Sequence, residues 1–115
     1  MLTLPSGVRI FAYAGHTDLR RSFDRLTAMV REILRRDVTA GHLFLFRNRS
    51  GDRLKILYYE PTGFWIFYKR LHRGTFHLPE ARGDSSDIEI ESADLATLLE
   101  GIGSSTAKRP SPPPR

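Results

Sequence analysis

The sequence predicts one α+β domain built on an antiparallel sheet of four to six strands, with one long helix after the first strand packed on one face and a short C-terminal helix. Three patterns lead to this fold class: an alternating segment followed by a helical apolar period, a series of short β-rich runs separated by turns, and a second helical period near the C-terminus. The length of 115 residues fits a single hydrophobic core. We therefore expect one domain over residues 1–103.

The first strand and the long helix are expected in the first third of the chain. Side chains alternate with a period of two over residues 8–13, which is typical of a strand. Thr17 and Asp18 then supply a hydroxyl that can accept a hydrogen bond from the first helical turn and an acid at the positive end of the helix dipole. The helix is expected to begin there and to run to about Arg36. Its apolar stripe consists of Leu19, Phe23, Leu26, Val30 and Ile33.

Beyond Gly41 the sequence changes to short runs rich in β-branched and aromatic residues. The four expected strands cover residues 43–47, 54–59, 64–71 and 75–78. Turn residues separate them at positions 48–52, 61–63 and 73–74. Because connections this short leave no room for a crossover, neighbouring strands are expected to be antiparallel.

The last part of the chain predicts one more strand and one more helix. Ile88 and Ile90 alternate with acids, which favours an edge strand. Ser92 can cap a helix whose apolar side consists of Leu95, Leu98, Leu99 and Ile102. Residues 104–115 contain four prolines and almost nothing that a core could bury, so we expect a disordered tail there.

The composition excludes several classes of protein. No cysteine is present, which excludes a disulfide scaffold and any metal site built on cysteine. No run approaches the roughly 20 apolar residues that cross a bilayer, so we expect a cytoplasmic location and no membrane partner. The formal charge is +5, and residues 1–80 hold 14 Lys or Arg against 7 Asp or Glu. Such a field attracts polyanions but does not choose between nucleic acid, acidic proteins and anionic lipid.

No arrangement of residues points to catalysis or to a cofactor. Most acids of the first 80 residues have a local explanation, such as capping for Asp18 and a turn for Asp52. The histidines lack the i, i+4 spacing that aims two imidazoles from one helix at a zinc ion. They are His16, His42, His72 and His77. We expect no catalytic residue, no metal and no cofactor.

Cations and aromatic rings are interleaved over residues 47–73. Cations neutralise phosphates and ring faces stack on exposed bases, a combination that suits nucleic acid. If the hairpin register brings the side that carries Arg53 and Lys55 next to the side that carries Trp65, one sheet face becomes a basic surface with stacking rings. The alternative is that the rings form core. The candidate contacts are Arg47, Arg49, Arg53, Lys55, Tyr59, Trp65, Lys69, Arg70 and Arg73.

A second basic surface is expected on the outer side of the long helix, opposite its apolar stripe. It contains Arg20, Arg21, Arg25, Arg31 and Arg35. These arginines outnumber the acids beside them, so they either contact a polyanion or form a solvated helix face.

Four segments resemble one protein family in order and spacing. They are LPSGVR at 4–9, GHTDLRRSFD at 15–24, GDRLKILYYE at 51–60 and GFWIFYKRL at 63–71. Together they are similar to the TnpB accessory protein, the second open reading frame product, of the insertion-sequence family numbered sixty-six. His16 stands where many relatives carry Pro, and Tyr58-Tyr59 where Trp is frequent. The resemblance implies a non-catalytic protein encoded beside a larger transposase and needed with it for efficient transposition.

Three functions remain open from the sequence. The first is binding of DNA, together with the cognate transposase and other products of the same element. The second is a protein adaptor that docks the transposase through exposed rings, with an incidental basic charge. The third is a nuclease, which would need carboxylates converging on divalent metal ions. The oligomeric state is not determined by these patterns.

Overall fold

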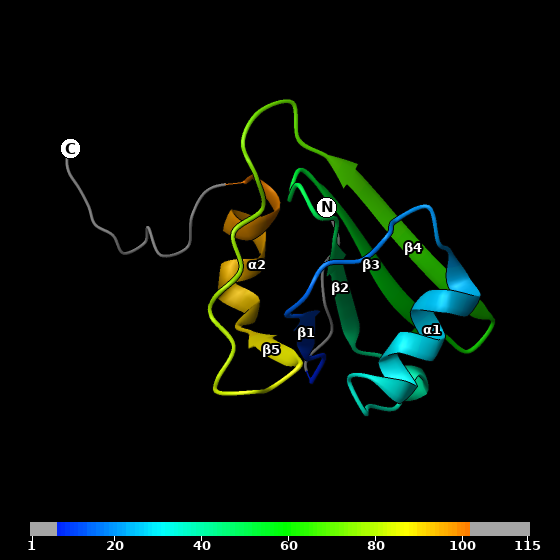
Figure 1. Ribbon diagram of the computed structural model, residues 1–115. Coiled ribbons are helices and arrows are strands. Elements are labelled where there is room, and N and C mark those ends of the chain that lie inside the picture. Colours follow the sequence, from blue (N-terminus) through cyan, green and yellow to red (C-terminus); the bar gives the residue numbers. More distant parts are fainter. Residues whose placement is uncertain (1–6, 102–115) are drawn as a thin grey trace.

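The computed structural model describes residues 7–101, and the tail expected over residues 104–115 lies outside them. The strands form one sheet, and helices pack against it (Figure 1). The elements in chain order are β1 (Ile10–Tyr13), α1 (Phe23–Glu32), the 3-10 helix η1 (Val38–Ala40), β2 (Leu43–Arg47), β3 (Arg53–Glu60), β4 (Gly63–Arg70), β5 (Asp87–Ile90) and α2 (Ser92–Leu99). No helix in this part of the chain is long and apolar enough to cross a membrane.

The five strands form one mixed sheet in the order β4-β3-β2-β1-β5. β1 and β2 are parallel, with Ile10 opposite Leu43, whereas the other three pairs are antiparallel. The α+β class is therefore confirmed, but the expectation of a wholly antiparallel sheet is wrong at this pair. The connection between β1 and β2 contains α1 and is long enough to return the chain to the same end of the sheet.

The helix α1 is shorter than the sequence predicted at both ends. Thr17 donates its backbone N–H to the Arg47 carbonyl at 2.8 Å, so the chain there still follows the sheet instead of turning into a helix. Asp18 does not cap α1, because its carboxylate accepts from the backbone and side chain of Arg20. At the other end, Arg35 has a left-handed φ of 60°, which stops helical continuation.

The expected strands are mostly confirmed, and one is wrong. The bounds of β2 are as predicted, and those of β3 and β4 differ by one residue at each end. β5 contains the expected edge pair Ile88 and Ile90. Residues 75–78 do not form a strand: the Phe76 ring is buried, and its N–H donates to the Gly51 carbonyl in the turn between β2 and β3 instead of to a neighbouring strand. In α2, Glu91 is the N-cap and Ser92 lies inside the helix.

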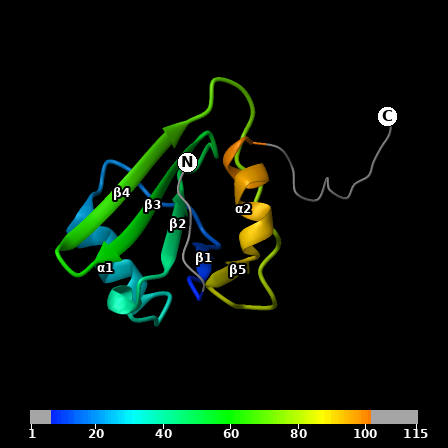
Figure 2. The same ribbon diagram turned by 180° about the vertical axis from the view of Figure 1, so that it is seen from behind.

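Apolar side chains cover both faces of the sheet. α1 packs on one face, where Leu26 and Val30 meet Phe11 and Phe44. α2 packs on the other face, where Leu95 and Leu98 join a cluster that includes Leu45 and Ile88. Figure 2 shows the two helices from behind, at opposite ends of the row of strands. The sheet is thus a central layer, and its strand ends and edges remain for contact with other molecules.

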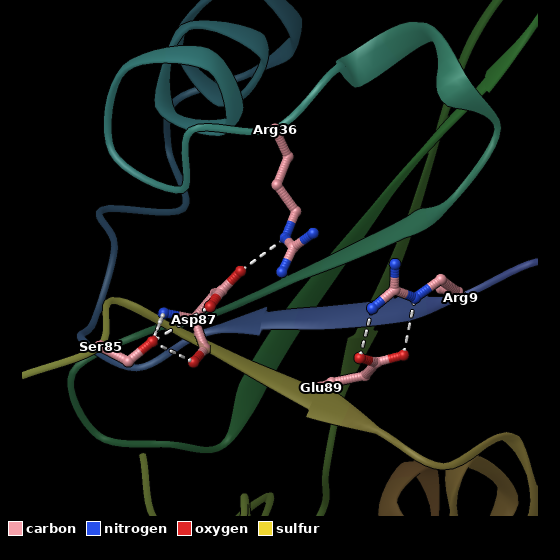
Figure 3. Close-up of polar contacts among 5 residues, drawn as sticks. All are labelled: Arg9, Arg36, Ser85, Asp87 and Glu89. Atoms are coloured by element: carbon pink, nitrogen blue, oxygen red, sulfur yellow. Dashed lines mark hydrogen bonds and ion pairs between the residues drawn. The ribbon is translucent and has the colours of Figure 1, made fainter. Parts of the chain in front are cut away.

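Two ion pairs hold β5 against the rest of the sheet (Figure 3). Arg36 donates from Nε to Asp87 at 2.6 Å, and its guanidinium lies 3.6 Å from the centroid of the Phe11 ring. Arg9 pairs with Glu89 at 2.7 Å, but both of these side chains are about half exposed. The Arg36 pair is the less exposed of the two, so it is the one expected to stabilise the edge.

Replacing Arg36 with alanine is expected to reduce the free energy of unfolding by about 1 to 2 kcal/mol, because a partly buried charge pair and a cation–π contact are lost. Arg9→Ala is the control and should cost less than about 1 kcal/mol, because its ion pair is about half exposed and its guanidinium lies farther from the Phe11 centroid, at 4.9 Å. Urea denaturation followed by circular dichroism measures both. Equal losses in the two variants would contradict a special role for Arg36.

Candidate nucleic-acid interface

The register of the β3–β4 hairpin places on opposite faces two groups of side chains that the sequence suggested would meet. Glu60 pairs with Gly63, so the turn contains two residues instead of the three expected from the sequence. A one-residue difference moves side chains to the other face of a strand. Lys55 therefore shares a face with Tyr68, while Trp65 lies on the face covered by α2. The surface that would have combined Arg53 and Lys55 with the Trp65 ring is therefore not formed.

On the sheet face against which α2 packs, the candidate residues Trp65 and Lys69 interact with other residues of the chain. The Trp65 ring stacks on Phe67 with centroids 5.8 Å apart, and its Nε1 donates to Glu60 at 2.6 Å. Lys69 donates from Nζ to the Leu99 carbonyl at 2.8 Å, at the C-terminal end of α2. A cation in this position stabilises the negative end of the helix dipole. Lys69 therefore has a structural partner within the chain.

Two further candidates are engaged inside the protein. Lys55 is only 9% exposed, and its ammonium donates to the Arg21 carbonyl at 2.9 Å, which ties the segment before α1 to the sheet. Arg47 donates to the Phe76 carbonyl at 2.9 Å, and burial lowers the pKa of its guanidinium. These cations hold loops in place and present little charge to a partner.

A hollow of about 650 Å³ opens at the end of the sheet where β3 begins and β4 ends. Residues 16–20 form one wall, and the turn at 48–50 forms the other together with Arg53 and Tyr68. The cations at its rim are Arg20, Arg49 and Arg53. Three arginines from two distant parts of the sequence thus meet around one opening.

Of the remaining candidate residues, one lies beside this hollow and the others do not line it. Arg70 is exposed and is the register partner of Arg53, so it lies beside the hollow. Arg73 is exposed in the loop that follows β4. Tyr59 packs edge-on against Phe64 at 5.2 Å, near the opposite end of the hairpin. Neither Tyr59 nor Trp65 lines the hollow, whereas Tyr68 and His16 do.

A hydrogen-bonded turn fixes the wall that carries Arg49 and Arg53. Asn48 accepts from the Arg53 N–H through its side-chain oxygen at 3.0 Å and donates to Asp52 at 2.9 Å. Ser50 donates to the same carboxylate, and the hydrogen bonds from Asn48 and Ser50 lower the pKa of Asp52. Because the turn is held in one conformation, binding of a ligand does not have to order the backbone that carries Arg49 and Arg53.

The opposite wall contains an ion pair that keeps Asp18 ionised. Arg20 donates from Nε and Nη2 to the Asp18 carboxylate at 3.0 and 2.8 Å. The side-chain hydrogen bond from Arg20 is the main cause that lowers the pKa of Asp18 to about 2. The pair therefore contributes fully above the ordinary acid pKa and is lost only as the pH falls toward 2. At neutral pH Asp18 offsets one of the three arginine charges at the hollow.

Arg20→Ala is expected to raise the pKa of Asp18 from about 2 toward its ordinary value of 3.8. The backbone N–H of residue 20 still donates to the carboxylate, so part of the depression remains. Carbon-detected NMR titration of the Asp18 carboxyl measures the change, and Arg25→Ala is the control that leaves the pair intact. A titration unchanged by Arg20→Ala would show that another group holds the carboxylate ionised.

A smaller hollow of about 350 Å³ adjoins the first one and is lined by some, but not all, of the arginines predicted for the outer side of the long helix. Both are lined by residues 16–18, and Arg21 and Arg25 line the second. Arg31 and Arg35 line neither hollow, so they are separate from the other arginines of the predicted helix surface. Thr17 lies between the hollows with its hydroxyl buried and without a hydrogen-bond partner among the described residues.

Sequence reasoning missed part of this site. Asn48 and Ser50 were recognised only as turn residues, while His16 and Tyr68 received no binding role. Their convergence depends on the parallel pairing of β1 with β2, which continues as the bond between Thr17 and Arg47. No local pattern reports that contact, because the two segments are about thirty residues apart in the sequence.

Comparison with known proteins identifies the family of this chain. The family TnpB_IS66, described as IS66 Orf2 like protein, matches residues 8–109. The chain belongs to this family. IS66 Orf2 proteins are transposition-associated accessory proteins and not catalytic ones. Within residues 7–101 of this member, no group of three His, Asp or Glu side chains is placed to hold a metal ion.

Two relatives of this IS66 Orf2 protein come from Sinorhizobium fredii (strain NBRC 101917 / NGR234). One, named "Uncharacterized protein y4hO", is 45% identical over 101 residues, which cover 86% of each chain. The other, named "Uncharacterized protein y4jC", is 29% identical over 103 residues, which cover 90% of this chain and 86% of the relative. No solved structure matches the chain.

Proposed function

We propose that this IS66 Orf2 protein binds the phosphate backbone of nucleic acid at the larger hollow while the transposition complex assembles, and that a separate transposase performs the chemistry. The observation that supports the proposal is the meeting of Arg20, Arg49 and Arg53 around one opening. Arg49 and Arg53 have no ion-pair partner among residues 7–101. Exposed cations without partners are the groups that phosphates attract.

The surroundings of the hollow suit this role. Arg70 is exposed beside it as the register partner of Arg53, and Arg73 is exposed three residues further along the chain, just after the end of β4. Tyr68 is 53% exposed at the rim, so its ring is available to stack on an unpaired base. Contacts of this kind position a nucleic acid without reading its sequence. We therefore assign Arg49, Arg53, Arg70 and Arg73 to phosphates and Tyr68 to a base.

The salt dependence of binding tests the proposal. The purified protein is titrated with element-end DNA and with unrelated DNA, each at several salt concentrations and with or without the transposase. With two to four phosphate contacts, the logarithm of the binding constant should fall against the logarithm of salt with a slope of about −2 to −4. Similar affinity for both DNAs is expected without the transposase. Absence of binding at low salt would overturn the proposal.

A second candidate function is an adaptor that binds the transposase without contacting DNA. It is favoured by the exposure of Trp65 and Tyr68, which are each 53% exposed on β4. Binding through such rings would be mainly apolar and would persist at high salt. Retention of the transposase in high salt, together with no measurable affinity for DNA, would select this function over the first.

A further inference from the structure

The two edges of the sheet differ in how they are protected. β5 is four residues long, and its acids are paired with Arg36 and Arg9, so short length and charge guard this edge. β4 is eight residues long, contains no proline, and pairs with β3 without interruption. It carries the exposed rings of Trp65 and Tyr68. Figure 2 shows β4 as the outer strand, at the end of the row opposite β5.

We propose that two copies of the chain pair through β4, antiparallel and about a two-fold axis at Ile66, so that their sheets join into one. An unpaired strand edge is a template for another strand, because its N–H and C=O groups lack partners. A two-fold arrangement makes the same strand serve as both template and partner.

The hydrogen bonding of β4 fixes which backbone groups are free. Leu71 donates its N–H to the Asp52 carbonyl at 2.8 Å, and bonded pairs alternate along an antiparallel ladder. The N–H and C=O groups of Phe64, Ile66 and Tyr68 therefore point away from β3. With the axis at Ile66, this residue pairs with its own copy, and Phe64 pairs with Tyr68 of the second copy. At these positions the β4 strands of the two copies would exchange backbone hydrogen bonds.

The side chains at this register are complementary on both faces. On the face of α2, Trp65 of each copy lies opposite Phe67 of the other. The stack of Trp65 on Phe67 within one chain, with centroids 5.8 Å apart, then becomes a row of four rings. On the face of α1, Phe64 lies opposite Tyr68 of the second copy, and Ile66 meets Ile66. The rings that are half exposed in one chain thus become covered, so pairing through β4 and stacking of Tyr68 on a base exclude each other, while the arginine contacts to phosphates do not depend on either.

The charges favour a second copy in the antiparallel direction. Lys69 of one copy lies opposite Gly63 of the other, and Glu60 is the next residue in that row. Nothing lies within 4 Å of the position that a Gly63 Cβ would occupy. The Lys69 ammonium donates one N–H to the Leu99 carbonyl and has two more, so it can also reach toward the Glu60 carboxylate of the second copy. A parallel pairing would instead place Lys69 beside Lys69 and Arg70 beside Arg70. Like charges directly opposite one another are destabilising.

The mass of the full chain in solution tests the proposal without nucleic acid. Light scattering and sedimentation at 1 M salt should give the mass of a dimer that dissociates on dilution. Trp65→Lys combined with Tyr68→Lys places charges in the new ladder and should raise the dissociation constant at least about tenfold. Phe23→Lys, which alters a 42% exposed ring on α1, is the control and should leave it unchanged. Circular dichroism verifies that each variant is folded.

Cross-linking tests the register. The chain contains no cysteine, so Ile66→Cys introduces one thiol. Across a bonded antiparallel pair the two Cα atoms are about 5.5 Å apart, which a disulfide can bridge. Mild oxidation should link two copies through position 66, whereas Ala96→Cys, exposed on α2, should link slowly.

Three results would overturn this proposal. They are the mass of one chain at every concentration, a dimer unaffected by the double lysine variant, and cross-linking at position 66 no faster than at position 96. Protection of the β4 amides from hydrogen exchange only when the transposase is added would assign the edge to that protein instead. Because the mass is measured at high salt without DNA, none of these results bears on the phosphate-binding proposal.

Discussion

Replacing Arg49 and Arg53 together with alanine is expected to weaken DNA binding roughly 50-fold at 0.1 M salt and to flatten the salt slope by about 2. Each lost phosphate contact removes the release of about 0.9 counterion, which is worth nearly tenfold in affinity between 1 M and 0.1 M salt. Both side chains lie at the rim of the hollow and outside the core, so stability should change little. Fluorescence anisotropy at four or more salt concentrations measures affinity and slope together.

Arg31→Ala combined with Arg35→Ala is the matched control for this experiment. It removes the same net charge from exposed positions that do not line the larger hollow. If binding depends on local phosphate contacts, the control should reduce affinity by less than about threefold, through the general field alone. Equal weakening by the two double variants would mean that the total charge of the protein, and not the hollow, attracts DNA.

Phe44→Ala is expected to lower the free energy of unfolding by about 3 to 5 kcal/mol, the range for removing a buried aromatic side chain. Phe44 is 1% exposed in β2, the middle strand of the sheet, and its ring stacks on Phe11 at 5.9 Å. The cavity would open beneath α1, between the helix and the parallel pair of strands. Since small domains are stable by about 5 to 15 kcal/mol, the variant should still fold at low temperature.

Phe23→Ala is the control for this core substitution. It removes the same side chain from the start of α1, where the ring is 42% exposed, and should cost less than about 1 kcal/mol. Urea denaturation monitored by circular dichroism gives both values. A loss below about 1 kcal/mol for Phe44→Ala would contradict the packing of α1 on this face of the sheet.

Local pattern was sufficient to predict most of the elements. A run of residues with high strand propensity located β2 to its end residues, because such side chains suit a buried strand. The turn at 48–52 was equally clear from its asparagine, serine and glycine. The same reasoning placed the start of α1 too early, since the capping residues Thr17 and Asp18 form other hydrogen bonds in the folded chain.

The candidate site was less predictable than the fold. The sequence identified Arg49 and Arg53 among nine candidate residues, but it could not separate them from Lys55 and Lys69. These two lysines donate to backbone carbonyls of distant segments, at Arg21 and Leu99. Which cations remain free depends on which carbonyls fold next to them, and a sequence pattern does not contain that information.

The sequence by itself determined the family, the basic charge and the approximate positions of the strands, because these depend on residue identity and on neighbours a few positions away. Only the tertiary structure decided the parallel pairing of β1 with β2 and the two-residue turn that places Lys55 and Trp65 on opposite faces. Both are contacts between segments, and a shift of one residue in such a contact reverses a whole strand face. The basic hollow exists because the parallel pairing, which continues as the hydrogen bond from Thr17 to Arg47, brings residues 16–20 next to the turn at 48–50.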